Sequence, residues 1–224
     1  MSCSKQLSEQ RINTIINDRS KIQEAKCVDI VAMIQEELSK TYNVNLVLKK
    51  RLMLHQVLDK LKRLNPDVEY GEVGKTSFIT PDGGFLYLID KDGNEYPILI
   101  TEVKTQGTND ARAKAGKKAQ AKGNAIERLG KNVIVIKEFL SNEDINPFVC
   151  FGEGCDFAEG STILDRVISI ARFRPINTLN LFNDSEGSYF FREEKWSPEE
   201  MFNILKDVAE QSINYYKQKY GDIF

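Results

Sequence analysis

Three charged residues of this chain have types and spacings that suit metal-dependent hydrolysis. Asp82 lies in the turn signal Pro-Asp-Gly-Gly, Glu102 follows 20 residues later, and Lys104 stands two positions beyond it in the stretch Ile-Thr-Glu-Val-Lys. Side chains two apart on a strand share a face, so a strand here holds Glu102 and Lys104 together, and a neighbouring turn adds Asp82. Two carboxylates suit Mg²⁺, which polarises a phosphate and lowers the pKa of an attacking water. The lysine then stabilises developing charge or helps to orient and deprotonate that water.

Each part of this pattern also has an ordinary structural interpretation. Pro-Asp-Gly is among the commonest turn sequences, and a Glu-x-Lys pair is common on an exposed strand face. The position of the pair is more informative, because charges at the end of an otherwise buried strand are costly without partners. These residues alone leave open both a metal-nuclease site and a plain turn beside a charged strand.

The histidine and cysteine content narrows the chemistry further. The chain has one histidine, His55, which excludes a metal site built on several imidazoles within one chain. His55 lies in an amphipathic helical pattern, where we expect a structural or surface role. Cys150 lies in the apolar run Phe-Val-Cys-Phe, which predicts a buried thiol, and without a Cys-x-x-Cys pair we expect no zinc site. Any bound metal is expected to be a hard ion held by carboxylates and water.

Composition indicates a globular protein. The 224 residues carry a formal net charge of -2, with 41% hydrophobic and 29% charged residues. There is no apolar run of about 18 residues that could cross a membrane, and the N-terminus lacks the apolar core of a signal peptide. We therefore expect a cytoplasmic protein with no membrane partner, in which residues 1–224 form a single domain without repeats or linkers.

Positive charge is concentrated in one segment. Between residues 104 and 131 the basic residues are opposed only by Asp110 and Glu127. These basic residues are Lys104, Arg112, Lys114, Lys117, Lys118, Lys122, Arg128 and Lys131. A solvated helix face and a phosphate-binding footprint explain such a run about equally well.

Apolar spacing along the chain predicts alternating helices and strands. The helical patterns cover residues 5–40, 52–64, 111–140 with a break near Gly123, 163–173 and 197–220. The strand patterns cover residues 77–80, 85–89, 96–104, 147–152 and 188–191. We expect a hairpin or meander from 77 to 104, with Pro97 near a strand start or at an edge, and an edge position for 188–191. The result is an α/β sandwich preceded by a helical N-terminal segment, residues 1–70.

Longer stretches give the charged residues a family context. Pro81-Asp82 with Glu102-Val103-Lys104 fits the signature of the PD-(D/E)XK nuclease superfamily. The stretch Glu-Val-Lys-Thr-Gln-Gly from Glu102 is similar to the Glu-Ala-Lys-His-Gln-Gly segment of EcoRI-type enzymes. Gly-Asn-Ala-Ile-Glu-Arg at residues 123–128 resembles their recognition segment, which MunI-type enzymes carry in closely similar form. The chain thus resembles EcoRI-type type II restriction endonucleases over roughly residues 75–215.

The resemblance implies a fold and a catalytic centre. It implies an α/β nuclease core over residues 71–224, with a central mixed sheet flanked by helices. It also implies that Asp82 and Glu102 ligate Mg²⁺ with the carbonyl of Val103 as an additional ligand, and that Lys104 is the catalytic lysine.

A second group of residues is implied to read DNA. Asn124 and Ala125 would contact the inner adenines in the major groove, where an asparagine amide pairs with adenine N6 and N7. Asn124 also suits a helix cap. Glu127 and Arg128 would link protomers and support readout, although such a pair is more often a surface ion pair. Gln106 is a secondary candidate for a base contact.

These roles imply a substrate and an assembly. EcoRI-type and MunI-type enzymes read AATT with this segment, so we expect a palindrome with AATT at its centre, cut in both strands to leave 5′-phosphates and 5′ overhangs. Lys122 would donate to a flanking guanine or touch a phosphate. Lys114, Lys117 and Lys118 would contact phosphates without reading sequence. A palindromic site calls for a two-fold homodimer.

Two alternatives stay open beside the restriction enzyme. One is another PD-(D/E)XK nuclease of the repair or resolvase type, which recognises DNA shape and has no use for the segment at residues 123–128. The other is a non-catalytic DNA-binding protein of the same fold, which has no need of an intact Asp82, Glu102 and Lys104.

Overall fold

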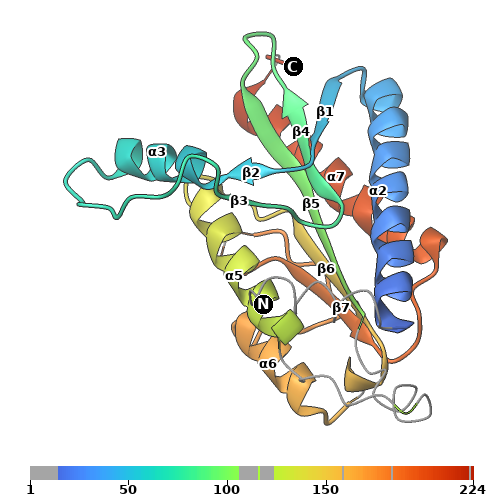
Figure 1. Ribbon diagram of the computed structural model, residues 1–224. Coiled ribbons are helices and arrows are strands. Elements are labelled where there is room, and N and C mark those ends of the chain that lie inside the picture. Colours follow the sequence, from blue (N-terminus) through green and yellow to red (C-terminus); the bar gives the residue numbers. More distant parts are fainter. Residues whose placement is uncertain (1–14, 106–115, 117–123, 158, 183, 222) are drawn as a thin grey trace.

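The computed structural model describes residues 15–105, 116, 124–157, 159–182, 184–221 and 223–224, which form a sheet with helices on both faces (Figure 1). The helices are α2 (Ile15–Tyr42), α3 (Leu54–Leu64), α5 (Asn124–Phe139), the 3-10 helix η1 (Cys155–Phe157), α6 (Thr162–Ile170) and α7 (Pro198–Tyr220). The strands are β1 (Asn45–Lys49), β2 (Leu52–Met53), β3 (Phe78–Ile79), β4 (Gly84–Ile89), β5 (Glu95–Thr105), β6 (Phe148–Glu153) and β7 (Ser188–Arg192).

The central sheet is mixed, as expected. Its strand order is β1-β4-β5-β6-β7, with antiparallel pairing from β1 to β5 and parallel pairing from β5 to β7. Parallel neighbours need a crossover connection, and α5 and α6 lie in the two crossovers. The carboxyl ends of β5, β6 and β7 therefore meet at one edge of the sheet, and β7 is the edge strand that the sequence predicted.

Both faces of the sheet are covered. On β6, Val149 and Phe151 face a core shared with α2 and α7, whereas Phe148 and Cys150 face a core shared with α3, α5 and α6. Because both faces are buried, the strands are nearly continuous apolar runs. Each fully buried side chain of this size contributes about 1.5–3 kcal/mol relative to its exposed state. This burial holds β5 rigidly at the centre of the sheet.

The predicted hairpin is confirmed between β4 and β5. Asp90 accepts hydrogen bonds from the backbone N–H groups of Asp92 at 2.9 Å and Asn94 at 2.7 Å, which closes the turn. Pro97 lies near the start of β5, beside a register shift between Leu86 and Tyr87 that accommodates its missing N–H. Strand β3 pairs with β2 in a separate two-stranded sheet, so the region is a hairpin and not a meander.

The N-terminal segment is not helical throughout. It carries α2 and α3, but β1 pairs with β4 along the edge of the central sheet. The expectation missed this strand because only Leu46 of β1 is fully buried, so its alternation of apolar and polar residues is weak. The short β2 likewise takes the first two residues of the expected helix at 52–64, which begins at Leu54.

In the C-terminal part of the chain, the start of α7 matches the expected capping signal, whereas the end of α6 differs from its expected position. The Ser197 hydroxyl accepts from the backbone N–H of Glu200 at 3.1 Å, and the Glu200 carboxylate accepts from the N–H of Ser197 at 2.9 Å, so α7 begins with a capping box. Helix α6 ends at Ile170, earlier than expected, because Arg172 and Phe173 have positive φ angles of 51° and 61°. In the described part of the chain no helix has both the length and the apolarity to cross a membrane.

Candidate active site

The Pro-Asp-Gly-Gly turn is packed directly against β5. The N–H of Gly83 donates to the carbonyl of Thr101 at 2.9 Å, and that of Gly84 donates to Pro81 at 3.0 Å. A Cβ atom on Gly83 would lie 2.8 Å from Cβ of Thr101 and 2.9 Å from Sγ of Cys27, so only glycine allows this approach. Gly84 has a φ of +75°, a conformation that other residues rarely adopt. The glycines thus fix the residue before them, Asp82, beside the strand.

Asp82 and Glu102 are linked by reciprocal hydrogen bonds. Oδ2 of Asp82 accepts from the backbone N–H of Val103 at 2.9 Å, and Oε2 of Glu102 accepts from the backbone N–H of Asp82 at 3.2 Å. Each carboxylate is therefore oriented by the backbone of the other's segment. The two carboxylates converge as the sequence spacing predicted.

The ammonium group of Lys104 lies where these oxygens meet. Its Nζ contacts Oε1 of Glu102 in a short ion pair, the carbonyl oxygen of Val103 at 3.2 Å, and Oδ2 of Asp82 at 3.4 Å. The side chains are largely buried, with exposures of 15% for Lys104, 18% for Asp82 and 4% for Glu102. A single cation thus contacts three oxygen atoms from two segments of the chain.

Burial and charge act in opposite directions at this cluster. Burial raises the pKa of Glu102, the charge of Asp82 raises it further, and Lys104 opposes both. For Lys104, burial would lower the pKa, but the carboxylates of Glu102 and Asp82 together raise it above its usual range. The ammonium is therefore held charged by the carboxylates. Such a buried cluster is a poor source of stability, which favours a chemical role for it.

The donor set fits a hard divalent cation. Two carboxylates and one backbone carbonyl offer oxygen ligands alone, which Mg²⁺, Mn²⁺ and Ca²⁺ prefer. The Lys104 ammonium contacts the same three oxygens, so the site already has the shape and charge that favour a cation. Across the described residues no group of three or more His, Cys, Asp or Glu side chains could hold a metal. A metal at Asp82 and Glu102 would therefore need the carbonyl and water as further ligands.

Two buried thiols pack close to the cluster. Burial, with the charges of Asp82 and Glu102, raises the pKa of Cys27, and burial likewise raises that of Cys150. Both are therefore neutral packing groups. The expectation of a buried thiol at Cys150 is confirmed.

The candidate recognition residues lie at the start of α5. Asn124 and Ala125 are the first two residues of this helix, followed by the buried Ile126 and the exposed Glu127 and Arg128. Both side chains of this pair are exposed to solvent. The other candidates, Gln106, Lys114, Lys117, Lys118 and Lys122, lie outside the described residues.

One residue at the site was missed by sequence reasoning. Nδ2 of Asn132, on α5, lies 3.4 Å from Oε1 of Glu102. Helical spacing puts Asn132 two turns beyond Asn124, but nothing in the sequence says which turn of α5 meets β5.

Comparisons with known proteins bear on this arrangement. A family model described as "Restriction endonuclease EcoRI" matches residues 9–163, which is more than half of the chain. The chain belongs to the EcoRI family. The family expected from the charged motif and from the segment at residues 123–128 is thus confirmed. It is a family of type II restriction enzymes, which are site-specific deoxyribonucleases.

Two members show how far the similarity extends. The chain is 30% identical to the Type II restriction enzyme RsrI of Cereibacter sphaeroides over 142 residues, which cover 59% of this chain and 51% of RsrI. It is 24% identical to the Type II restriction enzyme EcoRI of Escherichia coli over 246 aligned positions, which cover 91% of this chain and 89% of EcoRI. The match thus spans about half of RsrI and most of EcoRI.

Proposed function

We propose that this EcoRI-family chain is a Mg²⁺-dependent homodimer that hydrolyses both strands of double-stranded DNA at a palindrome with AATT at its centre. It would leave 5′-phosphates and 5′ overhangs. We place this activity in the cytoplasm, where its DNA substrate is accessible. The observation that carries the proposal is the convergence of the Asp82 carboxylate, the Glu102 carboxylate and the Val103 carbonyl on one cation position.

The catalytic residues have separable tasks. When bound, Mg²⁺ would polarise the scissile phosphate and lower the pKa of an attacking water. Asp82 and Glu102 would hold the ion through their carboxylates, and the hydrogen bond from Val103 N–H at 2.9 Å fixes the orientation of the Asp82 carboxylate. Lys104 supplies a positive charge that stabilises the developing charge on phosphate or orients the attacking water.

Recognition is assigned to the start of α5. The asparagine amide of Asn124 matches the donor and acceptor of adenine in the major groove, a pairing worth about 1–3 kcal/mol of discrimination. Ala125 adds an apolar contact there, with Gln106 as a second base contact. The exposed Glu127 and Arg128 would link this helix to the second protomer. A neighbouring Lys122 would contact an outer guanine or a phosphate.

The proposed assembly follows from the substrate. A palindrome presents the same bases twice about a two-fold axis, so two copies of the chain would each read one half-site. The basic residues Lys114, Lys117 and Lys118 would bind phosphates at either half-site without reading sequence.

Sequencing the ends of DNA fragments tests the proposal. Purified chain and Mg²⁺ should convert genome-sized DNA into fragments whose ends all share AATT within a four-base 5′ overhang. Asp82→Asn and Glu102→Gln should abolish cutting but retain specific binding in Ca²⁺, whereas Asp67→Asn, an exposed loop residue, should cut normally.

The alternatives predict other results. Nicking confined to branched junctions would indicate a repair or resolvase type of nuclease. Specific binding without any cutting, in every divalent metal tried, would indicate a non-catalytic DNA-binding protein. Fragment ends that lack AATT would overturn the assigned sequence.

A further inference from the structure

The Glu102 carboxylate is held from three directions. Oε2 accepts from the backbone of Asp82 at 3.2 Å, and Oε1 accepts both from Lys104 on the same strand and from Nδ2 of Asn132 at 3.4 Å. Asn132 belongs to α5, an element separate from both strand β5 and the turn that holds Asp82. The orientation of this carboxylate therefore depends on where α5 lies.

Helix α5 connects this contact with the recognition residues. Asn132 follows Asn124 by eight residues, which at 1.5 Å per residue is about 12 Å along the helix. Ile126, Leu129 and Val133 are buried in the core against the sheet, so the helix cannot rotate about its axis without losing that packing. A displacement of its first turn is therefore passed along a stiff element to Asn132.

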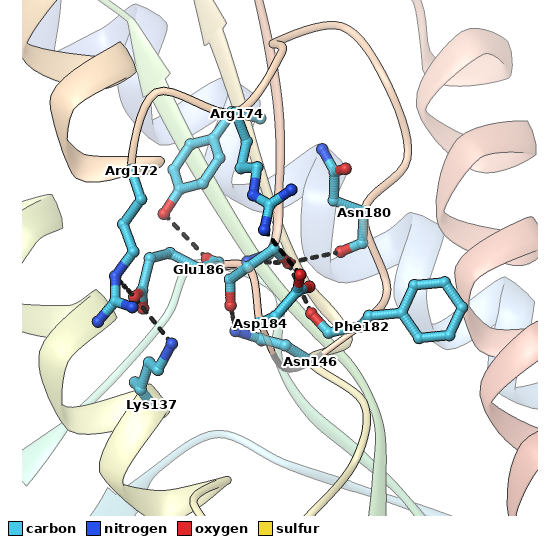
Figure 2. A network of polar contacts seen from close by, with 11 residues as sticks. Lys137, Asn146, Arg172, Arg174, Asn180, Phe182, Asp184 and Glu186 are labelled. Atoms are coloured by element: carbon cyan, nitrogen blue, oxygen red, sulfur yellow. Dashed lines mark hydrogen bonds and ion pairs between the residues drawn. The ribbon is translucent and has the colours of Figure 1, made fainter.

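The other end of α5 is anchored. Lys137 pairs with the buried carboxylate of Glu186 at 2.9 Å, and Arg172 pairs with the same carboxylate at 2.5 Å (Figure 2). Nζ of Lys60, on α3, donates to the carbonyl of Phe139 at 2.6 Å, at the last residue of α5. With its C-terminal end held by these contacts, we expect any displacement of α5 to be largest at its first turn, and Asn132, the ninth of its 16 residues, lies between the two ends.

We propose that Asn132 is a positioning residue, which orients the Glu102 carboxylate for the cation and ties that orientation to the helix that reads DNA. The inference rests on the proposed function, and it adds Asn132 to the residues that the proposed function uses for metal binding, catalysis and base readout. The side chain suits this task because its amide donates to Oε1 without bringing a charge. Oε1 already accepts from Lys104, so Asn132 adds a second, neutral donor that orients the carboxylate without adding another positive charge.

Calorimetric titration of Ca²⁺ into the free chain is the first arm of the test, since it needs neither cutting nor DNA. Asn132→Ala should weaken Ca²⁺ binding by about tenfold, in line with the loss of other residues that orient metal ligands. Asn132→Gln, which keeps the amide, should recover part of that loss. Glu138→Ala, an exposed position on the same helix, should bind Ca²⁺ normally.

Single-turnover cutting and DNA binding form the second arm. Asn132→Ala should slow cutting at saturating DNA, with the loss reduced at high Mg²⁺, while its affinity for DNA in Ca²⁺ stays within about twofold of the unsubstituted chain. Thermal melting of each variant checks that the fold is retained.

The outcomes separate this inference from the proposed function. Normal Ca²⁺ binding and normal cutting by Asn132→Ala would overturn it, as would a loss of DNA affinity as large as the loss of cutting. If the unsubstituted chain cuts no DNA, the proposed function fails. The Ca²⁺ titration still decides whether Asn132 supports the cation site.

Discussion

Oδ2 of Asp82 accepts a hydrogen bond from the backbone N–H of Val103 at 2.9 Å, although the two residues are 21 positions apart in the sequence. The bond joins a turn to the middle strand of the sheet, at the residue that precedes Lys104. The same Oδ2 also contacts Nζ of Lys104, which in turn contacts Oε1 of Glu102 and the Val103 carbonyl.

Lys104 and a divalent cation should compete for the same oxygens. Without metal, Lys104→Met leaves the carboxylates of Asp82 and Glu102 buried without their cation, so it should lower the free energy of unfolding by about 3–5 kcal/mol. Added Ca²⁺ should restore most of that loss, because it supplies positive charge at the same position. Urea unfolding in EDTA and in Ca²⁺ measures both effects, with Lys62→Met on the exposed end of α3 as control. Equal stability in the two buffers would contradict the shared position.

Substitution of the proposed base-reading residue and substitution of a proposed phosphate-contacting residue should have different effects on DNA affinity. Asn124→Ala should weaken binding to the cognate duplex by about 1–3 kcal/mol and leave binding to unrelated duplexes unchanged. Lys117→Ala should weaken binding to every duplex and reduce the slope of log affinity against log salt by about one. Fluorescence anisotropy in Ca²⁺ over a range of salt concentrations separates them. If Asn124→Ala weakened binding to every duplex equally, Asn124 would not be a base-reading residue.

The capping box of α7 gives a pH-dependent contribution to stability. The hydrogen bond from Arg192, with those from Ser197, lowers the pKa of Glu200 from 4.5 to about 2. A carboxylate with a depressed pKa in the folded state stabilises above its unfolded pKa and loses that effect as pH falls toward the folded value. Because the Glu200 side chain is 44% exposed, solvent screening limits the effect to about 1 kcal/mol or less.

Glu200→Gln tests this contribution, since glutamine preserves the shape of the capping box. The variant should be less stable than the unsubstituted chain at pH 7, and the difference should shrink between pH 4.5 and pH 2. Urea unfolding of both proteins across that range gives the difference directly. A constant difference at every pH would assign the effect to packing.

Gly152 on β6 leaves room for the ring of Phe191 on the neighbouring strand β7. A Cβ atom there would lie 2.1 Å from the ring of Phe191 on β7, and the Gly152 carbonyl also accepts from the Trp196 indole at 3.0 Å. Gly152→Ala should therefore lower the free energy of unfolding by about 1–3 kcal/mol through overpacking. Thermal unfolding measures the loss, and Gly71→Ala, where a Cβ meets nothing within 4 Å, should change little. The double variant Gly152→Ala, Phe191→Leu should recover part of the stability if the ring is the cause.

Much of the scaffold was predictable because its signals are local. The hairpin turn at Asp90 and the capping box at Ser197 each depend on residues within four positions of one another. The shared face of Glu102 and Lys104 follows from the period of a strand. Strand β1 was not predictable in this way, because most of its stabilisation comes from pairing with β4, more than 30 residues later in the chain.

The sequence by itself determined the residue types of the site and the family to which the chain belongs, because short motifs of fixed spacing identify both. Only the tertiary structure decided that Asp82 donates its backbone N–H to Glu102, and that Asn132 meets the same carboxylate from another helix. These contacts join segments that are 20 and 30 residues apart, and their geometry depends on how the turn and α5 pack against β5. Periodicity states which face a side chain occupies, but packing between elements decides which side chains meet across that face.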